Sequence, residues 1–166
     1  GHTMLLPPSV YLEKSNTDSL FLPFRMFNSG EKLYVELNYL PEDKIPNGSE
    51  IITINGVSAA TILNTLLNGM MRDGNNDGYA RWALNWWFME YFSYFYNHPP
   101  AFEIQYINAN GSVQQTTITG SSKEEIFENR TKRYPNRSFT RTYDQKPGTA
   151  VVFTLDTIHS IAIMKI

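Results

Sequence analysis

A stretch of about twenty residues in the first half of the chain constrains the fold most. Residues 50–54 form a short apolar run, Asn55-Gly56 follows directly, and Ser58 precedes apolar residues at helical spacing. Asn-Gly suits a tight turn after a strand because both residues tolerate positive φ, and serine is a preferred helix N-cap. The segment therefore predicts a strand, a tight turn and an amphipathic helix over 59–70.

A second helix is predicted over residues 79–97, the most apolar segment of the chain. It holds all three tryptophans, and its polar residues leave only a narrow polar stripe: Arg81, Asn85, Ser93 and Asn97. A helix of this kind is buried on more than one side or rests on a partner. The prolines at 99 and 100 end it.

The remaining segments predict strands and connections. Apolar residues alternate over 33–39, typical of a half-buried strand, and Asn28-Ser29-Gly30 is predicted as the turn that leads into it. Hairpins are predicted from 102–106 with 113–119, and from 150–155 with 161–166. Residues 120–148 are polar and basic and are predicted to be a linker or extended cover. This order lacks regular βαβ alternation, so the predicted fold class is α+β.

Composition excludes several kinds of chemistry. The 166 residues include no cysteine, which excludes disulfides, thiolate nucleophiles and cysteine-ligated zinc. The formal net charge of −2 argues against a chain-wide nucleic-acid field. No apolar run approaches the roughly 18–20 residues of a membrane span, and no signal peptide is recognisable. The chain starts without methionine and ends in an apolar run, so we expect a piece of a longer protein.

Residues 45–58, IPNGSEIITINGVS, resemble the strand, Asn-Gly turn and helix start of PDZ-like domains. Gly1-His2-Thr3 resembles the end of the D-G-H-T motif that precedes the PDZ-like insert of C-terminal-processing (tail-specific) serine peptidases and their tricorn-like relatives. The terminal runs 150–155 and 161–166 resemble the first strands of the catalytic domain in that family.

The resemblance implies a PDZ-like small β-sheet or barrel with two helices and a flanking terminal β-hairpin. Residues 1–20 would enter from a preceding domain, 21–120 would be the PDZ-like domain, and 121–166 would be a linker with the first strands of a truncated protease domain. Two features depart from the family pattern. Ser49-Glu50 stands where Gly-Asp is usual, and the aromatic helix is long enough to fill a peptide groove.

The implied function is a non-catalytic domain that recognises or positions polypeptide for a serine endopeptidase cleaving near C-termini. The implied partners are polypeptide C-termini or unfolded segments and the rest of the parent protease, in an exported, periplasmic or cell-envelope location. The nucleophilic serine would lie beyond residue 166, so this chain is expected to be inactive. His2 matches the position of the catalytic base in the tricorn-like branch.

Peptide binding is predicted at a sheet edge by strand addition. The strand would present Leu33, Tyr34, Val35 and Leu37, and main-chain N–H groups of Asn28, Ser29 and Gly30 would receive the terminal carboxylate. The alternative is an edge that residues 4–23 or the missing catalytic domain already cover.

Other patterns carry weaker predictions. Residues 73–78 match half of a calcium loop, but Leu84 stands where a bidentate glutamate is needed, so no metal and no cofactor are expected. Basic residues interleave with aromatics over 130–141, which we interpret as a solvated linker, or a face that packs on the rest of the parent protein, rather than a nucleic-acid site. Two other functions stay open: a carbohydrate- or lipid-binding module built on the aromatic helix, and a structural spacer whose aromatic face is an interface.

Overall fold

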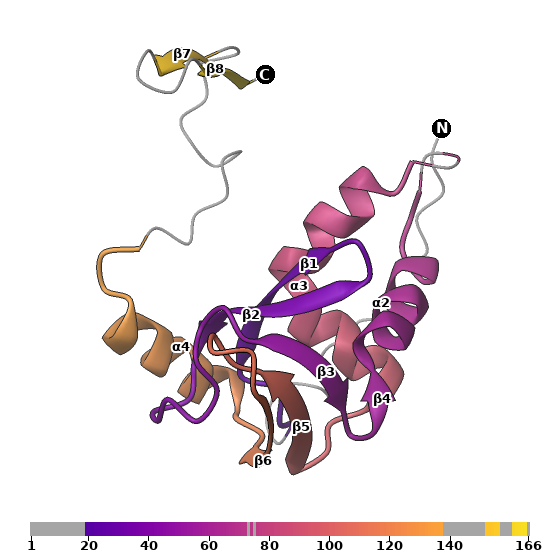
Figure 1. The fold of residues 1–166 in the computed structure, drawn as a ribbon, viewed down its shortest axis with the longest axis vertical. Helices are drawn as coiled ribbons and strands as arrows, with labels where there is room; N and C mark the ends of the chain where they lie inside the picture. Colours follow the sequence, from indigo (N-terminus) through magenta and orange to yellow (C-terminus); the bar gives the residue numbers. More distant parts are fainter. Residues whose placement is uncertain (1–18, 73, 75, 138–151, 157–160, 166) are drawn as a thin grey trace. The chain divides into compact units, whose positions relative to one another are not determined.

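The computed structural model describes residues 19–137, except 73 and 75, together with the strand residues 152–156 and 161–165 (Figure 1). Contacts divide the chain into two compact units, residues 1–135 and 136–166. His2 and the other residues predicted at the N-terminal junction lie outside the described residues. So do residues 73 and 75 of the calcium-loop pattern.

One antiparallel sheet organises the first unit. Its strands follow the order β1-β2-β3-β5-β6, and the short strand β4 pairs with β3 off this path. Their bounds are β1 Phe24–Ser29, β2 Lys32–Asn38, β3 Glu50–Ile54, β4 Val57–Ser58, β5 Ala101–Ile107 and β6 Val113–Thr119. Along this described path, β1 and β6 are therefore the two outer strands.

Two tight turns set the register of this sheet. Asn55 and Gly56 have φ of 49° and 76°, and they join β3 to β4 as the sequence predicts. The turn predicted at 28–30 is displaced, because Asn28 and Ser29 are the last residues of β1. The connection to β2 is a two-residue loop that begins at Gly30, whose φ of 59° suits glycine.

Helices α2 (Ala59–Asn68) and α3 (Gly78–Tyr96) confirm the two predicted helices. The Ser58 hydroxyl accepts a hydrogen bond from the Thr61 N–H at 3.1 Å and so caps α2. Helix α3 has a kink at Trp87, where φ is −121° and ψ is 24°.

The core lies between the sheet and these two helices. Its largest fully buried side chains include Met26 and Leu33 of the first hairpin, Ile62 of α2, Phe88 and Phe92 of α3, and Phe102 of β5. Burying a side chain of this size contributes about 1.5–3 kcal/mol to stability. The ends of α3 stay exposed, with Tyr79 and Tyr94 largely in solvent.

Part of the predicted linker is instead a helix, α4 (Lys123–Arg133), which follows β6 directly (Figure 1, orange). Ser122 and Glu125 form a capping box, with acidic residues in the first turn and basic residues in the last. Only Ile126 of α4 is buried, so apolar periodicity could not reveal it. The first unit is thus an α+β domain with three helices among the described residues rather than the two predicted.

The second unit contains the predicted terminal hairpin. Strands β7 (Val152–Asp156) and β8 (Ile161–Lys165) pair antiparallel, in register from Val152 with Lys165 to Asp156 with Ile161. The assignment of this hairpin to a protease domain stays a prediction, as do the three predicted domain segments.

Candidate functional site

The strand predicted to bind peptide is an interior strand. Leu33 pairs with Asn28 of β1 on one side and with Ile51 of β3 on the other. The Val35 N–H donates to the Ser49 carbonyl at 2.9 Å, and the Gly48 N–H donates to the Val35 carbonyl at 2.7 Å. The expected free edge is therefore absent along 33–35. The sequence shows where a strand runs but not which neighbours it acquires.

The other predicted binding residues divide between core and surface. The side chains of Leu33, Val35 and Leu37 are buried in the core, and Tyr34 is half-buried. Ser29 and Gly30 are exposed at the end of the first hairpin. Asn28 alone directs a main-chain group to a sheet edge. A peptide-binding role for this set stays a prediction.

A polar cluster closes this end of the β1 edge. The Asn28 N–H donates to Asn85 Oδ1 of α3 at 2.8 Å. The Asn28 Nδ2 donates to the Arg81 carbonyl at 2.8 Å and also contacts Asn85 Oδ1. Within the described part of the chain, Asn28 Oδ1 is buried without a hydrogen-bond partner. Asn85 thus offers β1 a carbonyl oxygen, as a neighbouring strand would.

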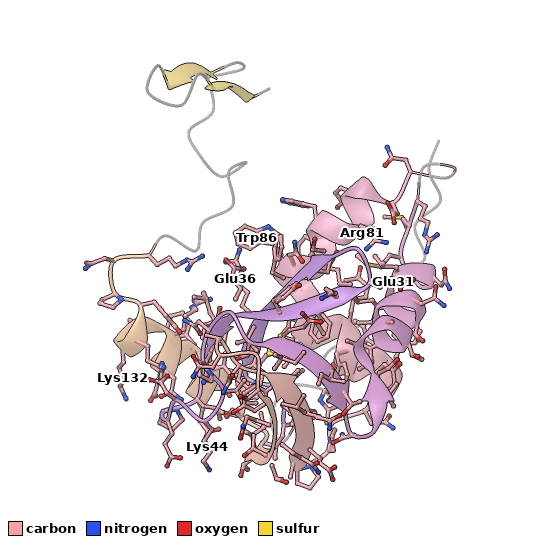
Figure 2. The ribbon with its side chains drawn as sticks, viewed as in Figure 1. Glu31, Glu36, Lys44, Arg81, Trp86 and Lys132 are labelled. Carbon is pink, nitrogen blue, oxygen red and sulfur yellow. The ribbon has the colours of Figure 1, made fainter. Side chains whose placement is uncertain are left out.

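Arg81 extends this cluster to the hairpin loop. Its Nη1 donates to the Gly30 carbonyl at 2.7 Å, and its Nε pairs with Asp77 at 2.6 Å (Figure 2). In the sequence, Arg81 and Asn85 stand out only as members of the polar stripe of the aromatic helix. Their spacing of four residues, which puts them on one helix face, is the signal that could have paired them with one strand.

Aromatic and charged groups line the helix beside β1. The Arg25 guanidinium lies 4.0 Å from the centroid of the Trp86 ring, and its Nε lies 2.7 Å from the Glu36 carboxylate (Figure 2). Trp82 links Trp86 to Tyr79, with ring centroids 6.3 and 5.8 Å apart. Helix α3 is therefore bound to β1 by stacking as well as by hydrogen bonds.

Two acidic side chains of the first unit have raised pKa values. Burial raises the pKa of Glu90, in the middle of α3, and Lys123 partly opposes that shift. Burial also raises the pKa of Tyr39 to about 12, with Arg25 and Arg130 opposing it. Desolvation is the largest cause of both pKa shifts.

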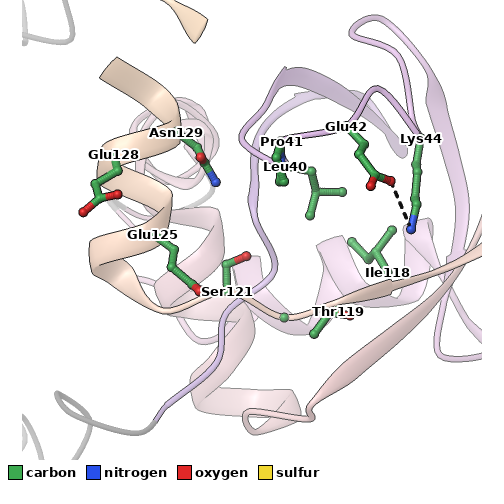
Figure 3. Close-up of a pocket in the computed structure, with 11 residues that line it drawn as sticks. Leu40, Pro41, Glu42, Lys44, Ile118, Thr119, Ser121, Glu125, Glu128 and Asn129 are labelled. Carbon is green, nitrogen blue, oxygen red and sulfur yellow. Dashed lines mark ion pairs between the residues drawn. The ribbon is translucent and has the colours of Figure 1, made fainter. Parts of the chain in front are cut away.

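A pocket of about 440 Å³ lies at the other end of the sheet. Leu40, Glu42 and Lys44 form one wall, and Glu125 and Asn129 of α4 form the other (Figure 3). Its base runs along Ile118, Thr119, Gly120 and Ser121, where β6 ends. The Lys44 ammonium lies 3.3 Å from the Glu42 carboxylate.

The loop that forms this pocket is held rigidly. Asn38, fully buried, donates from Nδ2 to the Ile45 carbonyl at 2.9 Å and accepts at Oδ1 from the Leu40 N–H at 2.7 Å. From α4, Arg133 Nη1 donates to the Leu40 carbonyl at 2.8 Å, and its guanidinium also contacts Asp43. These bonds hold the loop in the conformation that forms one wall of the pocket.

Among the described residues, no group of three or more His, Asp or Glu side chains is placed to hold a metal ion. His98 Nδ1 lies 3.1 Å from the Leu20 carbonyl, and its ring packs edge-on against Phe21. A search of the described helices finds none long and apolar enough to cross a membrane.

Comparisons with known proteins place the chain only loosely. No protein-family profile matches it, and no curated protein matches its sequence. One solved structure, the crystal structure of mature CPAF, a C-terminal-processing protease, is a weak neighbour with a TM-score of 0.45 and 12% identity. The alignment covers 88% of this chain and 31% of that one. This likeness concerns the course of the chain over part of a larger protein and assigns no activity to the present one.

Proposed function

We propose that this chain is a non-catalytic domain that recognises or positions polypeptide for a serine peptidase. The observation that supports it most is the bond from the Asn28 N–H to Asn85 Oδ1. An edge strand flanked by a helix offers main-chain donors and acceptors to an added strand. Here the Asn85 side-chain carbonyl accepts the bond that the Asn28 N–H would give to an added strand. The main-chain carbonyl of a bound peptide can replace it as the acceptor.

The proposed binding edge is thus β1 rather than β2. Alternate residues of an edge strand direct their main-chain groups outward. Asn28 is one such residue, and Met26 is the next in the same direction along the β1–β2 register. An incoming strand would pair along 26–28 after Asn85 and Arg81 release their contacts.

The wider setting of this proposal rests on the family resemblance of the sequence. The parent would be a C-terminal-processing peptidase of the exported, periplasmic or cell-envelope compartment. The nucleophile would lie beyond residue 166, and His2 would serve as the base only in the tricorn-like branch. The domain would hold a polypeptide C-terminus or an unfolded segment near that site.

The test is a heteronuclear NMR titration of the full 166-residue chain with short peptides that have free C-termini, beside amidated copies. We expect shifts at 26–29 and 81–85, and tighter binding to Asn85→Ala, because that variant removes the competing carboxamide. The matched control, Asn64→Ala, removes the exposed bond from Asn68 on α2 and leaves β1 untouched. If amidated peptides fail to bind, the site also recognises the terminal carboxylate of the peptide.

A structural spacer is the second candidate function. The cluster of Asn28, Arg81 and Asn85 favours it if these residues keep their contacts and never expose the β1 edge. Helix α3 already satisfies Asn28 and the Gly30 carbonyl, which blunts the edge as natural proteins often do. If millimolar peptide shifts no resonance of either the parent chain or Asn85→Ala, the peptide-recognition proposal is overturned. The structural spacer is then the function that the result supports.

A further inference from the structure

The outer edge of β6 carries main-chain groups that no described strand pairs. Both main-chain groups of Glu103 bond to Asn55, on the side away from β6: its N–H to Oδ1 at 2.8 Å, and its carbonyl to the Asn55 N–H at 2.8 Å. Glu103 is the register partner of Thr117. That pair is therefore a non-hydrogen-bonded one, and the N–H and carbonyl of Thr117 turn outward.

The same alternation extends along the whole strand. Gln115 and Thr119 are two residues from Thr117 on either side, so their main-chain groups also face outward. Two residues further on, Ser121 uses both outward groups to pair with Phe21, at 2.9 and 3.0 Å. One rung of strand pairing already exists on this edge, and the positions at 119, 117 and 115 continue it.

Nothing in the composition of β6 protects this edge. The strand VQQTTIT has no charge and no proline, and its seven residues pair with β5 without a bulge. Natural edge strands usually carry one of these devices, because a regular exposed edge is a template for another strand.

The pocket beside the end of β6 adds selectivity. Its lining carries three carboxylates, those of Glu42, Glu125 and Glu128, against the single ammonium of Lys44 (Figure 3). Glu42 lies 3.3 Å from that ammonium, and Glu125 Oε2 accepts from the Ser122 N–H, so the lining keeps a net negative charge. The same loop already binds one guanidinium, that of Arg133, through the Leu40 and Pro41 carbonyls and Asp43. A long cationic side chain is complementary in charge to a pocket whose lining carries three carboxylates and one ammonium.

We propose that the outer edge of β6 binds an extended segment of a partner polypeptide, whose Lys or Arg side chain enters the pocket between residues 40–44 and α4. Main-chain pairing along 115–119 supplies affinity, and the pocket supplies preference. This site lies on the edge opposite to β1 and does not depend on peptide binding there.

The test uses an acetylated, amidated heptapeptide, Thr-Val-Thr-Arg-Thr-Val-Thr, titrated into the labelled 166-residue chain. We expect shifts at 115–121 and 40–44. N-methylation of alternate peptide amides should weaken binding at least tenfold, because it removes main-chain donors. Norleucine in place of the arginine should weaken it about threefold, the usual effect of an exposed ion pair. Equal affinity for arginine and norleucine would overturn the role of the pocket.

Two variants of the chain separate main-chain pairing from side-chain contact. Thr117→Pro removes an outward N–H without taking a bond from the β5 ladder, and Thr117→Val keeps that N–H. We expect Thr117→Pro to bind at least tenfold more weakly and Thr117→Val to bind as the parent does, with far-UV circular dichroism confirming that both fold.

Several results would overturn the proposal. The first is no shift at millimolar peptide, and the second is equal binding by an N-methylated peptide. Shifts confined to 26–29 and 81–85 would favour the β1 proposal and contradict this one. Light scattering that shows a dimer of the parent chain, and a monomer of Thr117→Pro, would identify a second copy as the occupant instead.

Discussion

The two edges of the sheet present their main chains in opposite ways. At β1, helix α3 supplies the missing partners through Asn85 and Arg81, and the pairing with β2 shifts register between Arg25 and Met26. At β6, seven regular pairs end in an edge with no described partner strand. A sheet edge is thus protected by what packs beside it and not only by its own residues.

The largest expected effect contrasts proline at the two edges. Asn28→Pro removes the N–H that Asn85 accepts and the carboxamide that bonds Arg81, so we expect a loss of 3 kcal/mol or more in the free energy of unfolding, roughly the cost of a misplaced proline with buried polar groups left unpaired. Thr117→Pro should cost about 1 kcal/mol or less, since its N–H faces outward. Urea unfolding of both measures the difference, and equal costs would contradict the contrast.

The next largest effect on stability is expected from removing Asn85, the partner of Asn28 on α3. Asn85→Ala leaves the buried Asn28 N–H without its acceptor, so we expect a loss of about 1–3 kcal/mol. Asn64→Ala, on the exposed face of α2, should stay within about 0.5 kcal/mol of the parent. Similar unfolding midpoints for the two variants would show that α3 does not protect β1.

A smaller effect is expected where Arg81 reaches the hairpin loop. Arg81→Met keeps the aliphatic stem but loses the bonds to Gly30 and Asp77, which are partly exposed, so we expect about 1 kcal/mol of destabilisation. Arg72→Met is the matched control, because the bonds of Arg72 within the described part of the chain go to Leu67 and Asn68 of α2. Faster amide exchange at 28–32 in Arg81→Met alone would locate the loss at β1.

The smallest effect concerns Glu90, a half-buried carboxyl in the middle of α3. Burial raises the pKa of Glu90 above its usual 4.5 in the folded state, so the protonated form is favoured there. Its contribution to stability is full below pH 4.5 and is lost as pH rises through the raised pKa. Glu90→Gln should therefore be more stable than the parent at pH 7 and lose that advantage in acid. Parallel stability curves against pH would contradict the assignment.

The fold is predictable from the sequence wherever the signal is local. The Asn-Gly turn, the Ser58 cap, both apolar helices and the hairpins are confirmed because each depends on neighbours within a few residues. The helix α4 escaped prediction, because its capping box at Ser122 lay in a polar segment with a single buried residue. The candidate site was placed one strand away, since a strand pattern at 33–37 does not reveal that β1 and β3 flank it.

The sequence by itself therefore determined the α+β class, the main turns and the apolar faces, because backbone preference and hydrophobic period act over short distances. Only the tertiary structure decided which strands form the edges, that Asn85 completes one of them, and that loop 40–44 and α4 enclose a pocket at the other. Those features join residues 57 to 93 positions apart, and no local preference specifies such pairs.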